Sequence, residues 1–176
     1  MIRSKLIVLF VVAFIMACGN QHAPANITYE RFHELPRQFA IDFLSDTNFE
    51  ASFAKNKHQK IIYKTLTCSL SDDANFDIKH RLRFAFEGDI QLQNAFDSGG
   101  KVAYRYTSKG NFYENISNSH HDLIWGESLT QILQARKSIQ CKVVMTVYLS
   151  SPYYSNKMSI PTADITLRTE ERQEIP

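Results

Sequence analysis

The sequence has little of what marks non-globular proteins: its 176 residues include only six glycines and five prolines. Since 44% of the residues are hydrophobic, the chain is neither intrinsically disordered nor collagen-like. Long hydrophobic runs are also scarce. A single run stands at the N-terminus, which excludes a protein with several membrane-spanning helices. The length fits one domain with short extensions.

An excess of one charge is missing as well. The chain carries 20 lysines and arginines against 18 aspartates and glutamates, and two of the basic residues, Arg3 and Lys5, precede the hydrophobic run. Without them the two signs balance at 18 each. Nucleic-acid-binding proteins usually carry a clear basic excess. The sequence therefore argues against a nucleic-acid partner.

The N-terminal segment has the layout of a secretory signal peptide. Arg3 and Lys5 precede Leu6–Ala17, which is 12 residues without a polar side chain, whereas a spanning helix needs about 20. The run ends in Ile15–Cys18 (IMAC), which resembles the lipobox of bacterial lipoproteins. In that family the cysteine thiol receives a diacylglyceryl group, the peptide is cut before the cysteine, and the new amino group is acylated. A conventionally cleaved signal peptide or an uncleaved anchor is the alternative.

The resemblance covers residues 1–18 and implies that residues 1–17 are removed and that Cys18 is held in a lipid bilayer. Since two or more acyl chains anchor a protein durably, three chains on Cys18 would hold it permanently. Gly19 follows the cysteine, where lipoproteins retained in the inner membrane of many Gram-negative bacteria carry aspartate. This favours the periplasmic side of the outer membrane over the inner membrane. Residues 18–27 are small and polar, and we expect them to form a flexible tether.

Two cysteines, Cys68 and Cys141, remain once Cys18 is lipidated. An even pair in an oxidising compartment predicts a disulfide between them, across 73 residues. Two buried free thiols are the alternative. No spacing of cysteines and histidines indicates a zinc site, and no motif indicates a cofactor.

Hydrophobic periodicity predicts a single α+β domain over residues 28–169, followed by a charged tail at 170–176. Phe32, Leu35, Phe39 and Phe43 recur at three- and four-residue steps, which predicts an N-terminal helix broken near Pro36. Residues 46–59 resemble a loop with two phenylalanine anchors. Residues 128–137 have helical spacing, and Ser128 and Gln131 match a capping box at its start.

The rest of the domain alternates with a period of two, which predicts about seven strands connected by hairpins. Turns are expected at Gly88-Asp89, at Ser98–Gly100 and at Ser108–Asn111. This pattern indicates a mainly antiparallel fold, either a β-sandwich or a curved sheet. The predicted strands are Ile62–Leu70, Ile78–Glu87, Ile90–Leu92, Val102–Tyr106, Phe112–Ile116, Ile139–Leu149 and Ile160–Leu167.

The sequence lacks the common catalytic motifs. His33–Arg37 begins like the zinc-protease HExxH motif but has arginine in place of the second histidine. Gly126–Thr130 misses the nucleophile elbow GxSxG by its last residue, and no histidine follows Ser128. The dense group His120, His121 and Asp122 is compatible with a solvated loop, with weak metal binding or with acid–base chemistry. We therefore predict no catalytic residues and no metal site.

Two predicted surfaces are candidates for binding. Lys79, Arg81 and Arg83 would form a basic stripe on one face of a strand, either solvated or bound to anionic head groups. A second patch joins the outer face of the strand Ile139–Leu149, with Tyr148, to Tyr153 and Tyr154. Tyrosine-rich surfaces favour protein interfaces, although packing under the helix at residue 128 is the alternative.

These observations lead to three hypotheses of function. The first is a non-enzymatic envelope lipoprotein whose tethered domain binds a protein or an envelope component. The second is a carrier that holds an apolar ligand in a cavity lined by the aromatic and aliphatic residues Phe84, Phe86, Leu92, Tyr104 and Tyr106. The third is an enzyme that uses His120, His121 or Asp122.

Overall fold

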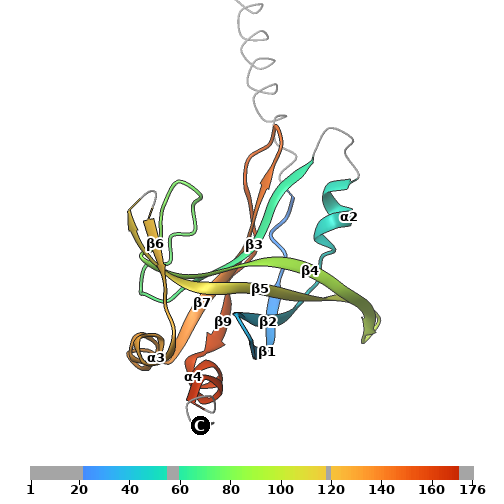
Figure 1. The fold of residues 1–176 in the computed structure, drawn as a ribbon. Coiled ribbons are helices and arrows are strands. Elements are labelled where there is room, and N and C mark those ends of the chain that lie inside the picture. The colour runs from blue at the N-terminus through green and yellow to red at the C-terminus, as the bar shows by residue number, and fades with distance from the viewer. Residues whose placement is uncertain (1–21, 55–59, 118–119, 171–176) are drawn as a thin grey trace, which may run out of the picture.

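The computed structural model describes residues 22–54, 60–117 and 120–170, which form one open antiparallel sheet of nine strands with three short helices (Figure 1). This confirms the predicted α+β fold, as a curved sheet rather than a sandwich. The strands are β1 (Ile27–Leu35), β2 (Gln38–Ser45), β3 (Ile61–Ser69), β4 (Phe84–Ser98), β5 (Lys101–Ser117), β6 (His120–Leu123), β7 (Ser138–Val147), β8 (Tyr153–Tyr154) and β9 (Met158–Pro161). The helices are α2 (Phe49–Ala54), α3 (Gly126–Gln134) and α4 (Thr162–Glu170).

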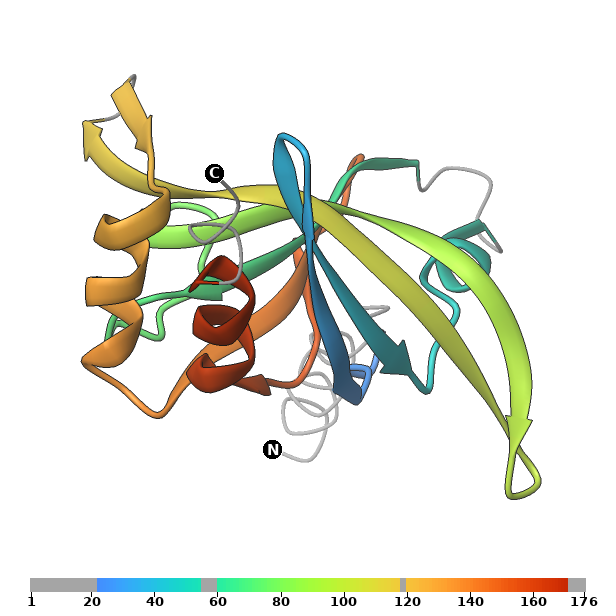
Figure 2. The ribbon, with the colours of Figure 1, turned by 60° about the horizontal axis from the view of Figure 1, so that its bottom comes forward.

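The strand order is β1-β2-β5-β4-β3-β7-β8, with β6 paired to β5 and β9 paired to β7. The sheet curls, so that β9 at one edge lies close to β1 at the other. The amide of Asn156, between β8 and β9, donates a hydrogen bond of 2.9 Å to the carbonyl of Ala25, just before β1. Figure 2 shows α3 and α4 side by side at one end, and the β4–β5 hairpin extending as an arm on the opposite side.

The core lies on the concave side of the curled sheet. Every second residue of β7 faces it, and the helices add buried side chains such as Leu129 and Leu133 from α3 and Ile165 from α4. Aromatic rings dominate the centre, where the ring of Phe112 contacts those of Phe39 and Phe86. This packing joins elements far apart in sequence into one main hydrophobic core.

The predicted disulfide is present. β3 pairs with β7 in a register that places Cys68 directly opposite Cys141, with the two Cα atoms 3.9 Å apart. Both cysteines are fully buried. The bridge therefore joins two neighbouring strands of the sheet within the hydrophobic core.

The predicted N-terminal helix is wrong, because residues 27–45 form the β1–β2 hairpin with its turn at Pro36 and Arg37. The pattern was ambiguous because β2 is buried on both faces: Phe39, Ala40 and Ile41 are all buried in succession. A strand without a polar face has no period of two, so its phenylalanines matched a helix equally well. The two expected phenylalanine anchors beyond it are buried, but they lie on α2 rather than in a loop.

Of the three turns predicted in this region, the β4–β5 hairpin contains one and lacks the other two. Gly99 and Gly100, both with positive φ, form the tight turn between the strands. The turns expected at Gly88-Asp89 and at residues 108–111 do not exist, because both strands run straight through them. Gly88 and Gly110 face each other across the two strands, where the backbones approach closely.

The C-terminal prediction is also partly wrong. The strand expected over Ile160–Leu167 ends at Pro161, and α4 follows. The predicted helix near 128–137 is present as α3, but it begins two residues earlier than Ser128, after Trp125. No capping box forms, because the side chain of Gln131 donates to Glu127 at 3.2 Å.

The part of the expected tether that the structure describes is packed against the domain. Ala25 and Ile27 are buried, and the amide of Ala25 donates to the Tyr153 hydroxyl at 2.7 Å. Cys18, the rest of the N-terminal segment and residues 171–176 of the predicted tail lie outside the described residues.

Candidate functional site

The predicted basic stripe does not exist as such, because Lys79, Arg81 and Arg83 lie in the connection between β3 and β4 rather than on a strand. The connection is shaped by repeated turns in which a side-chain oxygen accepts the backbone amide two residues later. Asp73, Asn75 and Asp77 each accept in this way, at 3.0, 3.1 and 2.8 Å. We call residues 72–83 the crossing loop.

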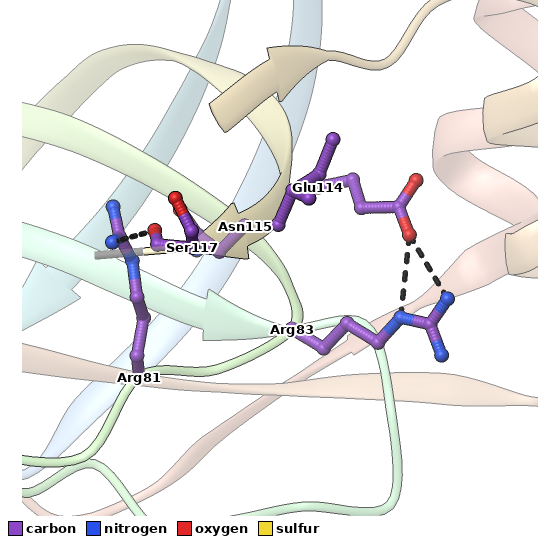
Figure 3. Close-up of a pocket in the computed structure, with 6 residues that line it drawn as sticks. Arg81, Arg83, Glu114, Asn115 and Ser117 are labelled. Carbon is purple, nitrogen blue, oxygen red and sulfur yellow. Dashed lines mark hydrogen bonds and ion pairs between the residues drawn. The ribbon is translucent and has the colours of Figure 1, made fainter. Parts of the chain in front are cut away.

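The end of the crossing loop is fastened to the end of β5 (Figure 3). Arg83 donates from Nε and Nη2 to one carboxylate oxygen of Glu114, at 3.2 and 3.1 Å, so its charge is paired. Arg81 donates from Nη1 to the carbonyl of Ser117. The side-chain amide of Asn115 donates to the carbonyl of Leu82 at 2.7 Å. These residues line a shallow pocket of about 440 Å³, and their contacts hold the loop in place.

A second cleft of about 440 Å³ lies between the crossing loop and the convex side of the sheet; we call it the outer-face cleft. Its floor consists of outward-facing residues of β3 and β7, namely Tyr63, Thr65, Thr67, Val144 and Thr146. Its wall consists of crossing-loop residues, chiefly Phe76, Ile78, Lys79 and Leu82. The floor thus presents three threonine hydroxyls beside Tyr63 and Val144. The wall is mixed, because Asn75, His80 and Arg81 line it together with the apolar residues, and Glu87 of β4 completes the lining.

Large apolar side chains at this cleft are open to solvent. Tyr63 is 60% exposed and Ile78 is 51% exposed, although Phe76 and Leu82 beneath them are buried in a small cluster of their own. Exposed apolar groups framed by polar ones are typical of protein-binding surfaces. Lys79 forms no ion pair with any residue that the structure describes, so it adds an available positive charge to the rim.

The three tyrosines of the predicted patch lie in three different environments. Tyr153 is buried in the core, so its ring is not part of a surface. Tyr154 is half-buried, and its hydroxyl accepts the amide of Ile78 at 3.2 Å, which ties the crossing loop to β8. Tyr148 remains exposed beyond the end of β7. Val144 and Thr146 face the outer-face cleft and not α3, which packs on the concave side.

The group His120, His121 and Asp122 lies on the short exposed strand β6. His120 Nε2 is 3.3 Å from an oxygen of Asp122, while the ring of His121 meets Tyr113 edge-on at 5.1 Å. Successive residues of a strand point to opposite sides, which keeps His120 and His121 apart. Within residues 22–54, 60–117 and 120–170, no three histidine, cysteine or acidic side chains are grouped to hold a metal ion.

The residues expected to line a ligand cavity are mostly packed. Phe86 and Tyr106 are fully buried in the core, whereas Leu92 is partly exposed on the β4–β5 arm. The Tyr106 hydroxyl accepts the amide of Phe49 at 2.9 Å and donates to Glu50 at 2.9 Å. Burial raises the pKa of Tyr106 far above its ordinary value. The ring is thus a core residue with a satisfied hydroxyl.

One buried polar cluster was missed by the sequence analysis. Asp42 of β2 is almost fully buried and accepts from Thr107 Oγ1 at 2.6 Å, Arg31 Nε at 2.7 Å and His33 Nε2 at 2.9 Å. Burial alone would raise the pKa of Asp42, but these three hydrogen bonds outweigh it and lower the pKa. The alternation of charges in Arg31, His33 and Asp42 across the hairpin was its only signal. The cluster joins β1, β2 and β5 through hydrogen bonds that converge on Asp42.

Comparison of the chain with protein-family models, with curated proteins and with solved structures finds no match. None of the helices among the described residues has the length and apolar character needed to cross a membrane.

Proposed function

We propose that the protein is a non-enzymatic lipoprotein of the bacterial cell envelope, held in the bilayer through acylated Cys18, whose domain binds a protein partner at the outer-face cleft. The observation that carries the proposal is the cleft itself. It combines exposed Tyr63 and Ile78 with a hydroxyl-rich floor and the available charge of Lys79. Aromatic and aliphatic anchors surrounded by polar groups are the usual centre of a protein interface.

The proposed location in the cell envelope is supported by the N-terminal sequence and is compatible with the disulfide. A bridge such as Cys68–Cys141 persists outside the cytoplasm and is rare within it. The lipobox-like IMAC segment accounts for the third cysteine.

Replacing Cys18 by alanine should release the protein from the membrane. The acyl chains that hold the protein in the bilayer would be lost. Fractionation of cells, with mass spectrometry of the N-terminal peptide, measures the effect. A conservative change beside it, Asn20→Gln, is the control. Membrane retention of the C18A variant equal to that of the wild type would contradict the lipid anchor.

The partner-binding role is tested by capture from intact envelopes with two matched variants. Ile78→Glu places a charge in the outer-face cleft, whereas Val102→Glu makes the same change at an equally exposed position on the β4–β5 arm. We expect a stoichiometric partner to be recovered with the wild type and V102E, and recovery to fall about tenfold or more with I78E, as for a central interface residue. Recovery of no such partner, or equal losses with both variants, would contradict the proposal.

A further inference from the structure

The end of the sheet where β3 begins and β7 ends presents an apolar tip. Ile62, Tyr148 and Leu149 are 58%, 55% and 83% exposed, and we call them the β7–β8 tip. The amide of Tyr148 donates to the carbonyl of Lys60 at 2.8 Å, which joins the end of β7 to the start of β3. Leu149 is the most exposed large hydrophobic side chain among the described residues.

The backbone of Leu149 adds a second observation. Its φ is 55°, and it is the one described residue other than glycine with a positive φ. A bulky side chain is rarely found in this left-handed conformation, which glycine adopts without cost. Leucine here holds an apolar side chain outward from a strained turn. Strained residues of this kind cluster at binding sites, where the side chain is needed.

The chain also enters the domain at this end. The hydroxyl of Tyr153, the first residue of β8 after the tip, donates to the carbonyl of Ala23 at 3.3 Å and accepts the amide of Ala25 at 2.7 Å. The ring of His22 lies 4.1 Å from that of Phe53. The segment that leads to Cys18 is therefore attached to β8 and α2, close to the apolar tip.

The length of chain between this attachment and the acylated cysteine is short. Cys18 precedes His22 by four residues, and four residues span at most about 14 Å when fully extended. A lipid anchor on Cys18 thus keeps the entry end of the domain at the membrane surface. The apolar tip at that end then faces the same leaflet.

We propose that the β7–β8 tip inserts into the head-group region of the leaflet that holds the acyl chains of Cys18. Leu149 and Ile62 supply apolar groups, Tyr148 is a residue type that favours membrane interfaces, and exposed Lys60 can approach lipid phosphates. The contact fixes the orientation of the domain, which an acyl anchor alone leaves free. This inference rests on the proposed lipid anchor.

The test uses the full lipidated protein reconstituted in vesicles of phosphatidylethanolamine and phosphatidylglycerol. A cysteine at exposed Ser150 carries the fluorophore NBD, and a control reporter is placed at Val102 on the distant β4–β5 arm. The native thiols do not react, because one is acylated and two form the disulfide. We expect nitroxide-labelled lipids to quench most of the fluorescence at position 150 and little at position 102. Leu149→Asp should reduce the quenching at position 150.

The outcomes separate the tip from the anchor. Protein that floats with the vesicles, with position 150 quenched no more than position 102, would overturn the tip contact and leave the anchor intact; a protein occupant would then be the explanation for the apolar tip. Protein that neither floats nor carries lipid on Cys18 would overturn the anchor and the tip contact with it. Leu149→Gly removes the side chain and relieves the strained φ, so it should reduce quenching without loss of folding; unchanged quenching in this variant would also count against the proposal.

Discussion

Reduction of the Cys68–Cys141 bridge should lower the free energy of unfolding by about 4 kcal/mol, because the bridge closes a loop with a sequence separation of 73 residues in the unfolded chain. The two cysteines are direct partners on β3 and β7 and fully buried, so the native sheet keeps its packing when the bond opens. Reduction therefore acts mainly by giving the unfolded chain more conformational freedom, which stabilises the unfolded state. Urea unfolding of the oxidised and reduced forms measures the loss of free energy, and the reduced form should also show a steeper dependence on urea.

Single and double alanine variants provide the control for this prediction. Cys68→Ala removes the crosslink as completely as the double variant with Cys141→Ala, so the two should differ only by the packing lost at the second sulfur. A reduced protein with an unfolding free energy within about 1 kcal/mol of the oxidised one would contradict the loop-closure argument. Free thiols at both positions in cells would contradict the proposed envelope location.

The bridge has a wider consequence because β3 and β7 carry both proposed binding surfaces. Tyr63 and Thr146 line the outer-face cleft on the convex side of these strands, and the β7–β8 tip lies at their end. The disulfide lies between two strand pairs, Thr67 with Lys142 and Ser69 with Gln140. It fixes the register of β3 against β7 at this point. It thus holds the cleft and the tip in one rigid arrangement.

The sequence predicted those parts of the fold whose signal is local. The alternation in Ile139–Val147 identified β7, because one of its faces is buried and the other is not. The Gly99-Gly100 pair identified the hairpin turn, because both positions have positive φ. The disulfide followed from an even pair of cysteines behind a secretory signal, and both cysteines lie on the buried faces of strands.

The sequence failed where tertiary packing decides the outcome. β2 is buried on both faces, and its period of two is therefore absent. The crossing loop alternates in hydrophobicity like a strand, yet the side chains of Asp73, Asn75 and Asp77 satisfy backbone amides locally and prevent strand pairing. Their spacing at every second residue was the available signal. Gly110 resembled a turn residue, although its role is to allow close approach of strands.

Only part of the candidate site could be predicted from the sequence, because the rest of it depends on tertiary packing. Tyr148 and the outward face of β7 followed from alternation, and both are at or beside the proposed surfaces. Tyr63 and Ile78 were missed as exposed anchors, because exposure depends on which segments cover a strand. Arg81 and Arg83 were assigned to a binding stripe, but they fasten the crossing loop to β5.

Replacing Gly110 by alanine should be the most destabilising change in the sheet outside the disulfide, with a cost of about 3 kcal/mol or more. A Cβ atom at Gly110 would overlap the backbone of Glu87 and lie 2.6 Å from its carbonyl carbon. β5 cannot move away, because it pairs with β2 through Phe39 and with β4 through Gly88 at this same residue. The strands must separate, and thermal or urea unfolding of the G110A variant measures the loss.

The other glycines of the hairpin give a graded control. At Gly88 an added Cβ would lie 2.4 Å from Ser108 Oγ, a side-chain atom that can rotate away, and 2.9 Å from the backbone of Lys109, so Gly88→Ala should cost less than G110A. At Gly99 nothing lies within 4 Å, and asparagine tolerates its positive φ, so Gly99→Asn should cost under about 1 kcal/mol. The order Gly110, Gly88, Gly99 follows from backbone separation alone. If G110A and Gly99→Asn destabilised the protein equally, the close approach of β4 and β5 would not be what requires glycine at residue 110.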